Sequence, residues 1–424
     1  MTSHPEISPL RSLGLSVYLP SAFMAVGQMA LLVILPIYIV EGGGGVVAAA
    51  LVFAMRGFGS MLVNVPAGLA IARWGHRATM LSGTGLMGVS AVMIATASSH
   101  WVVAGATLMF GAGMGAWLLA RLAYITEQVP NWQRGAAMSG LAGLQRLGVL
   151  LGPFVGGIGV EYLGYSAVFL AISVIAWITV LLLWLFAPPG GAAHQERDGR
   201  QIPCHGYPAT VVTAIPTFGL MTLVPSVLRR HRKVFLSAGV FVFCLQLLRE
   251  QRRLLVVLWG TSIGVGVEEI GFIVSIAAVA DMAMFPIAGY IMDHWGRKVA
   301  GLSCIGILSV ALGLLPLTST VMTYLLATVI GGVGNGLGSG IILTMGSDIA
   351  PPGERSQFLG VWRMVGDLGA LVGPLMTSIT ASIVAALGFS MIVGLGGGLV
   401  LLICVDETLS SRVTSKIGEP DGCT

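Results

Sequence analysis

The chain has 424 residues, of which 55% are hydrophobic and only 9% are charged, and its mean hydropathy is +0.90. A soluble domain carries about a quarter charged residues, so this composition excludes a protein that covers itself with a solvated surface. The net charge is only +4 and the basic residues are scattered over many loops, which excludes a nucleic-acid-binding patch. The class that remains is an all-α membrane protein with many spans.

Twelve apolar stretches of roughly 20–28 residues recur along the chain, and this is the length that a transmembrane helix requires. The first stretch shows no obvious cleavage site, so we interpret it as a retained helix rather than a signal peptide. The twelve predicted spans are Leu15–Val40, Val46–Ala72, Ala78–Ala97, Trp101–Thr126, Gly135–Val160, Gly164–Ala187, Val234–Thr261, Val267–Met292, Val299–Thr318, Val321–Ser347, Ser356–Ile383 and Ala385–Val405.

A polar, proline-containing segment separates the sixth span from the seventh. Its portion Val211–Leu228 is apolar, but Pro216 and Pro225 interrupt it, and we expect it to lie at the interface rather than to cross the bilayer. The predicted organisation is a six-helix bundle over 1–187, a linker over 188–233, and a second bundle with a tail over 234–424.

The distribution of Lys and Arg predicts the orientation. Loops on the N-terminal side contain fifteen of them, whereas loops on the other side contain none and carry only Glu41, Glu161, Glu268 and Glu269. Positive loops stay on the cytoplasmic side. We therefore expect a multi-pass plasma-membrane protein with both termini and the linker in the cytoplasm.

The two halves repeat at a fixed offset of 221 residues. Three sequence features of the first half recur at that offset in the second, in register over more than eighty residues: Gly68…Gly75 with Gly289…Gly296, Pro130…Arg134 with Pro351…Arg355, and Gly152-Pro153 with Gly373-Pro374. The pattern indicates a duplicated six-helix unit, which is typical of one large class of transporters.

The stretch Gly289–Lys298 resembles the cytoplasmic signature of the major facilitator superfamily, G-x-x-x-D-R-x-G-R-K, and Gly68–Arg77 resembles it with Ala72 in place of Asp. The resemblance implies two six-helix pseudo-repeats around a central cavity that work by alternating access. It also implies that Asp293 caps or pairs with the opposing half and is released when the halves rock. The residues assigned to this conformational motif are Gly68, Gly75, Arg77, Gly289, Asp293, Gly296, Arg297 and Lys298.

A second stretch, Gly148–Gly157, is similar to the g-x-x-x-G-P-x-x-G-G pattern associated with proton-coupled exporters in this family. Its glycines permit close helix contact and its proline loosens the backbone ladder. A third family pattern has an Arg four residues before Gly111, where this chain has Thr107. The motif residues are Gly148, Gly152, Pro153, Gly156 and Gly157.

Ten charged residues lie deep within the predicted spans, away from their ends. A charge at the bilayer centre costs about 2.5–3.5 kcal/mol, so we expect these groups to face a cavity or one another. The basic ones are Arg56, Arg121, Arg146, Arg249, Arg252, Arg253 and Arg363, and the acidic ones are Glu250, Asp281 and Asp367.

The family's helix arrangement implies that Arg146 could pair with Asp281 and Arg56 with Asp367, while Arg363 competes for Asp367 at i,i+4. Structural salt bridges and proton coupling are equally compatible with such pairs. Proton coupling requires a pair to open during transport. Asp281 and Asp367 are the leading coupling candidates.

The stretch Arg249–Arg253 looks like a loop, but the offset maps it onto Gln28–Leu32 in the middle of the first span. It is therefore predicted to lie inside the seventh helix. Its three arginines fall within about 100° of arc, and Glu250 can pair with Arg253, which leaves about two positive charges uncompensated. The candidate substrate-binding residues are Arg249, Glu250, Arg252, Arg253, Gln28, Asn335 and Trp117, the last two on spans that line or flank the family's cavity.

The function that these features favour is proton-coupled efflux of small drug-like or metabolite compounds. The alternative is uptake or exchange of a small organic anion, because arginines outnumber acids in the spans. The expected partners are a small-molecule substrate, protons and the lipid bilayer, with the chain acting as a monomer. The Cys spacing and His positions suggest no metal or cofactor, and no enzyme motif is apparent.

We predict that Arg249→Ala or Arg252→Ala abolishes transport while leaving the protein level nearly intact, because the face should meet the substrate. Vesicle transport normalised to the amount of folded protein measures this. Loss of folded protein with unchanged specific transport would instead show that the cluster is structural.

Overall fold

The computed structural model describes residues 14–129, 131–187, 225–351 and 354–407, and this part of the chain is built from helices. Ten of its helical segments are long and apolar enough to cross a membrane. The first, Leu19–Thr96, is interrupted by the non-helical residues Gly43 and Gly75. Dividing it at these points gives three passes and brings the total in the described residues to twelve, as the apolar stretches predicted. Most of the predicted linker, including residues 211–224, lies outside the described residues.

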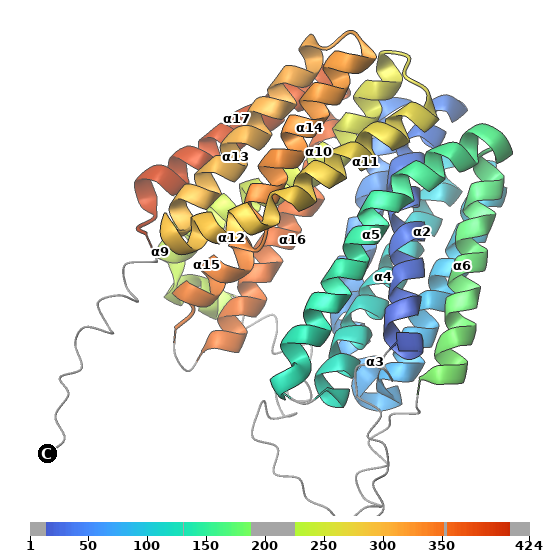
Figure 1. Cartoon of the computed structure of the whole chain (residues 1–424), viewed down its shortest axis with the longest axis horizontal. Coiled ribbons are helices and arrows are strands. Elements are labelled where there is room, and N and C mark those ends of the chain that lie inside the picture. Colours follow the sequence, from blue (N-terminus) through green and yellow to red (C-terminus); the bar gives the residue numbers. More distant parts are fainter. Residues whose placement is uncertain (1–13, 130, 188–224, 352–353, 408–424) are drawn as a thin grey trace, which may run out of the picture. The chain divides into compact units, whose positions relative to one another are not determined.

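Contacts between residues divide the chain into two units, and Figure 1 colours the first from blue to green. Unit 1 also includes Val267–Phe272, the first turns of a later helix. Its helical elements are η1 (Gly14–Tyr18), α2 (Leu19–Ile39), η2 (Val40–Gly44), α3 (Gly45–Thr96), α4 (His100–Gln128), α5 (Asn131–Leu163) and α6 (Tyr165–Phe186).

Unit 2 runs from yellow-green to red in Figure 1. Its helical elements are α9 (Arg232–Val234), η4 (Phe235–Gly239), α10 (Val240–Ser262), α11 (Val267–Ala283), α12 (Phe285–His294), α13 (Arg297–Leu314), η5 (Leu315–Leu317), α14 (Val321–Leu337), α15 (Ile341–Ile349), α16 (Arg355–Thr380) and α17 (Ile383–Cys404).

The two units share one internal packing pattern. In unit 1, α2 packs against α5 and α6, and α3 packs against α4 and α6. In unit 2, α10 packs against α16 and α17, and α13 packs against α14 and α17. These pairs correspond to one another under the 221-residue offset, so the sequence repeat is also a structural repeat.

Glycines set the closest helix contacts in both units. A Cβ at Gly148 would overlap Ala25, and one at Gly152 would lie 2.7 Å from the Val26 carbonyl oxygen, so α5 and α2 touch through their backbones. Gly369, which the offset relates to Gly148, makes the same approach from α16 to the Phe243 carbonyl of α10. Small residues allow this approach where lipid supplies no hydrophobic driving force.

The units diverge one turn further along this contact. In unit 1, a Cβ at Gly156 would lie 3.0 Å from the Ala30 Cβ. The related residues in unit 2 are Thr377 and Gln251, and the Thr377 hydroxyl donates a 2.8 Å hydrogen bond to the Gln251 side-chain oxygen. A polar contact therefore replaces the close glycine contact in unit 2, where Thr377 stands at the position of Gly156.

The predicted boundary between the second and third spans coincides with an interruption of α3. Gly75, which lies between the two predicted spans, is non-helical at φ 81°, and the chain is helical on both sides of it. Gly296, its counterpart, has φ 100°. Such values are readily adopted only by glycine, and the reversal between the two spans is therefore confined to a single residue.

The eighth and tenth predicted spans are each present as one membrane-length helical segment, with an interruption inside it. The eighth is divided at Met284 into α11 and α12, because Pro286 lacks the amide that a continuous helix needs. The tenth is divided between Leu337 and Ile341, where Gly338 and Gly340 interrupt it. The prediction that Arg249–Arg253 lies inside a helix is confirmed, since α10 includes all five residues.

We predict that Gly152→Leu lowers the free energy of unfolding by about 1–3 kcal/mol, because the side chain overlaps the α2 backbone. Gly143→Leu in the same helix is the matched control, since no atom lies within 4 Å of its Cβ position. Thermal unfolding in detergent compares them. Equal melting temperatures for the two variants would contradict the assigned contact.

Candidate functional site

The centre of the unit 2 charge cluster is Asp281, in the last turn of α11. Arg252 of α10 places Nη2 3.8 Å from Asp281 Oδ2, and Asn335 of α14 donates a 2.7 Å hydrogen bond to the same oxygen. Asp281 is 9% exposed, and its second oxygen, Oδ1, is enclosed without a hydrogen-bond partner. Side chains of three helices, α10, α11 and α14, therefore meet at one carboxylate, of which only one oxygen has polar partners.

Arg249, one turn before Arg252, binds a backbone carbonyl at the interruption between α14 and α15. Its Nη2 donates a 2.8 Å hydrogen bond to the Gly338 carbonyl, and its Nη1 lies 3.4 Å from the Gln246 side-chain oxygen. Carbonyls at a helix C-terminus lack an intrahelical partner and attract cations. Arg249 thus satisfies a carbonyl that the break exposes, beside the buried thiol of Cys304.

The remaining unit 2 charges form local pairs. Arg253 and Glu250 form an ion pair at i,i+3, and Arg363 Nε lies 4.0 Å from Asp367 Oδ2 at i,i+4. The expectation of two uncompensated positive charges on the seventh helix was wrong, because Arg252 contacts Asp281. The three-dimensional fold, rather than the helical spacing, brings that acid to the cluster.

In unit 1, Gln28 and Arg56 converge on the thioether of Met114. Gln28 Nε2 lies 2.5 Å from its sulfur and Arg56 Nη1 lies 4.0 Å from it, while the Arg56 guanidinium sits 5.4 Å from the Phe53 ring centroid. Gln28 is the offset counterpart of Arg249, and Met114 that of Asn335. These positions therefore meet at a thioether in unit 1, whereas in unit 2 they belong to the charge cluster around Asp281.

Two further candidates lie elsewhere in unit 1. Trp117 is buried in α4, with the Arg121 guanidinium 5.6 Å from its ring centroid. Arg146 lies half-buried on α5. The proposed pairs Arg146–Asp281 and Arg56–Asp367 each join residues of different units, and both stay predictions.

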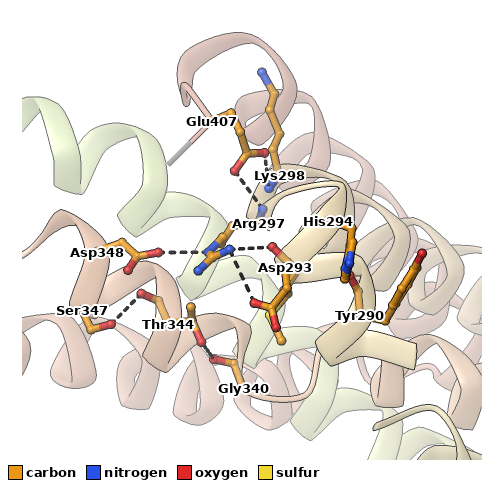
Figure 2. Close-up of polar contacts among 11 residues, drawn as sticks. Tyr290, Asp293, His294, Arg297, Lys298, Gly340, Thr344, Ser347, Asp348 and Glu407 are labelled. Carbon is orange, nitrogen blue, oxygen red and sulfur yellow. Dashed lines mark hydrogen bonds and ion pairs between the residues drawn. The ribbon is translucent and has the colours of Figure 1, made fainter. Parts of the chain in front are cut away.

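The cytoplasmic signature of unit 2 is organised around Arg297, as Figure 2 shows. Its Nε lies 3.0 Å from Asp348 Oδ2, and its Nη1 donates a 2.6 Å hydrogen bond to the Met292 carbonyl. Asp293 is 3.9 Å away and its side chain is 72% exposed, whereas those of Arg297 and Asp348 are 6% and 7% exposed. The buried partner of the signature arginine is therefore Asp348 of α15.

Glu407 ties this signature to the end of α17. Its carboxylate accepts the backbone N–H groups of Arg297 and Lys298 at 2.8 and 3.0 Å, in the first turn of α13 (Figure 2). Such groups have no partner within their own helix. In unit 1, the Arg77 guanidinium donates to the Trp184 carbonyl of α6, so each signature contacts the last helix of its unit or the residues that follow it.

Gly68 and Gly289 have no atom within 4 Å of their Cβ positions, so neither makes a close contact. Asp348, Glu407 and Gly338 were not among the site residues predicted from the sequence. A signal for Asp348 was present, because the offset relates it to Glu127 and both halves thus carry an acid there. Glu407 and Gly338 had no comparable signal.

Comparison with known proteins identifies the relatives of this chain. The model of the Major Facilitator Superfamily matches residues 17–259 and 254–423. A multi-drug resistance efflux pump PmrA homolog of Lactococcus lactis is 24% identical over 364 residues, which are 83% of this chain and 84% of that protein. The vesicular acetylcholine transporter of Rattus norvegicus is 29% identical over 173 residues, 39% of this chain and 33% of the transporter.

Among solved structures, a POT family transporter in complex with a thioalcohol-conjugated peptide superimposes with a TM-score of 0.73. The two chains are 13% identical, and the match covers 96% of this chain and 97% of the other. A second POT family structure, with 5-aminolevulinic acid, gives a TM-score of 0.71 at the same identity and coverage. At this identity the likeness concerns the fold.

We predict that Asp348→Asn destabilises the protein by about 3–5 kcal/mol, because it leaves the buried Arg297 guanidinium without its counter-charge. Asp293→Asn is the control, as it removes an exposed partner of the same arginine and should cost at most about 1 kcal/mol. Folded yield and melting temperature in detergent report both effects. If the two variants behave alike, Asp348 is not the main partner of Arg297.

Proposed function

The chain belongs to the Major Facilitator Superfamily and is a transporter rather than an enzyme, and we propose that it exports small, partly hydrophobic compounds in exchange for protons. The efflux-pump homolog, which is similar over most of both chains, supports the direction. The exporter-like stretch Gly148–Gly157 supports it too. Transport proceeds by alternating access, as is general in this family.

The observation that carries the proton coupling is the surroundings of Asp281. Its Oδ2 holds Arg252 and Asn335, and its Oδ1 is enclosed with no hydrogen-bond partner. A proton arriving at this carboxylate would weaken the ion pair with Arg252 and free that guanidinium. Asn335 also contacts this carboxylate and lies just before the break at Gly338. Protonation of Asp281 would therefore alter a contact next to the junction of α14 and α15.

Arg249 and Arg252, which lie one turn apart on α10, would couple protonation of Asp281 to movement of the helices. Arg252 binds the carboxylate and Arg249 binds the Gly338 carbonyl. A rotation of α10 that releases one guanidinium therefore disturbs the other. We assign both a role in coupling as well as the candidate substrate contact, with Asp367 and Glu250 as secondary acids.

The proposed location is the plasma membrane, with both termini cytoplasmic. The fifteen Lys and Arg on one side and none on the other support this orientation. The bundles over 1–187 and 234–424, joined by 188–233, are the bodies that rock, and the proposed functional unit is the monomer.

Uptake or exchange of a small organic anion is the second candidate. The excess of seven arginines over three acids deep within the predicted spans favours it. It differs from the first candidate in its driving force, since exchange needs an opposing anion gradient and no proton gradient.

The test is transport into inside-out vesicles, with fluorescent lipophilic cations, neutral aromatic compounds and aromatic carboxylates as probes. We expect a pH gradient with the vesicle lumen more acidic than the medium to drive accumulation of at least one class of probe. Asp281→Asn should reduce this accumulation to the level of empty vesicles while keeping probe exchange at equal pH, because binding does not need the proton.

Asp406→Asn is the matched control, since Asp406 is exposed and follows the last helix. It should retain gradient-driven transport. Accumulation that ignores pH and depends on an outward anion gradient would contradict proton-coupled export and favour the second candidate. If Asp281→Asn retains full coupling, the coupling acid has been assigned wrongly.

A further inference from the structure

Arg121 of α4 is a buried cation that the coupling mechanism does not use. Its side chain is 3% exposed and stacks on Trp117, with the guanidinium carbon 5.6 Å from the ring centroid. Nε is fully enclosed and has no hydrogen-bond partner. Within the described part of the chain, the Arg121 side chain makes no hydrogen bond or ion pair, so its charge is left without a counter-charge there.

The composition of the first half offers few acids that could meet it. The first Asp of the chain is Asp198, and before it the acids are Glu6, Glu41, Glu127, Glu161 and Glu196. Glu41 follows α2 and accepts a hydrogen bond from Tyr165, and Glu161 is exposed near the end of α5.

Unit 2 shows that this chain otherwise compensates its membrane arginines. Arg252 has Asp281 at 3.8 Å, Arg253 has Glu250, and Arg363 has Asp367 at 4.0 Å. Arg249, which has no such acid, binds a carbonyl. The offset relates Arg121 to Ile342, so its charge is not a requirement of the repeated fold.

The backbone around Arg121 is firmly held. A Cβ at Gly83 would lie 2.8 Å from the Gly113 carbonyl and 3.0 Å from the Trp117 amide, so α3 and α4 touch immediately before the arginine. Tyr124, on the following turn, is 3% exposed and packs edge-on to His76. The guanidinium is therefore presented by a rigid helix contact instead of a loop, as a specific binding group requires.

We propose that Arg121 and Trp117 bind the anionic group of the transported compound, a carboxylate on an aromatic or amphipathic small molecule. A guanidinium takes a carboxylate through two parallel hydrogen bonds, and the indole ring gives the adjoining apolar part a flat surface. This inference rests on the proposed function, since it names the class of substrate that the transporter carries. Arg121 is then a specificity-determining residue, separate from the charge cluster of unit 2.

The test measures binding without a proton gradient, so its outcome is independent of proton coupling. The full chain in phosphatidylcholine nanodiscs is unfolded thermally with matched aromatic carboxylates, their primary amides and their amines. A ligand that binds the folded state raises the melting temperature. We expect the carboxylates to do so and the amides and amines to have little effect.

Arg121→Gln should weaken carboxylate binding about 10- to 100-fold, the loss of a charge-assisted hydrogen bond. Arg121→Lys keeps the charge but not the paired geometry and should give an intermediate affinity. Arg73→Gln is the matched control, because Arg73 is an exposed arginine of unit 1 and its loss should change nothing. If Arg121→Gln fails to fold, Arg121→Lys and the carboxylate–amide comparison in the unaltered protein decide the matter.

Equal stabilisation by carboxylates and amides would overturn the proposal, and so would an unchanged carboxylate preference in Arg121→Gln. A third contrary outcome is stabilisation that depends on Arg121 in phosphatidylglycerol nanodiscs with no response to free carboxylates. The anion would then be a lipid headgroup. Absence of proton-driven transport with intact carboxylate binding would contradict the coupling mechanism alone.

Discussion

The bilayer interior offers no water, so ionised side chains and interrupted helix ends must find partners within the protein. In unit 2, α10 supplies those partners. Arg249 binds a carbonyl at the break of one helix and Arg252 binds a carboxylate near the break of another. The charged side chains of α10 and the interruptions in α11–α12 and α14–α15 therefore depend on each other. In hydrocarbon, each would leave charged or polar groups without partners if the other were absent.

The two units keep the same backbone contacts and give them different chemistry. Ala30 meets Gly156 in unit 1, where Gln251 meets Thr377 in unit 2. The Met114 thioether, which Gln28 and Arg56 contact, is likewise replaced in unit 2 by Asn335, which donates to the Asp281 carboxylate. A duplicated scaffold thus allows one unit to carry the proton-sensitive groups, while the other keeps an arginine available for a ligand.

Span number and the placement of Arg249–Arg253 were predictable, because hydropathy and the 221-residue offset are properties of the chain itself. The breaks were not, although Pro286 and Gly338 were visible in the sequence. Membrane helices tolerate such residues when neighbours satisfy the backbone, so a break at Gly338 depends on Arg249, which lies 89 residues away. The contact of Arg252 with Asp281 also depends on how the helices rotate in the fold, which spacing along the chain does not reveal.

Glu407 has a practical consequence for handling the protein. It follows α17, which ends at Cys404, and so appears from its position to belong to a dispensable tail. Its carboxylate nevertheless holds the first turn of α13, a helix cap of a kind worth about 1 kcal/mol. Truncating the chain before Glu407 to attach an affinity tag or fluorescent reporter would remove that cap and weaken the contact with the signature Gly289–Lys298. A fusion beyond Glu407 keeps it.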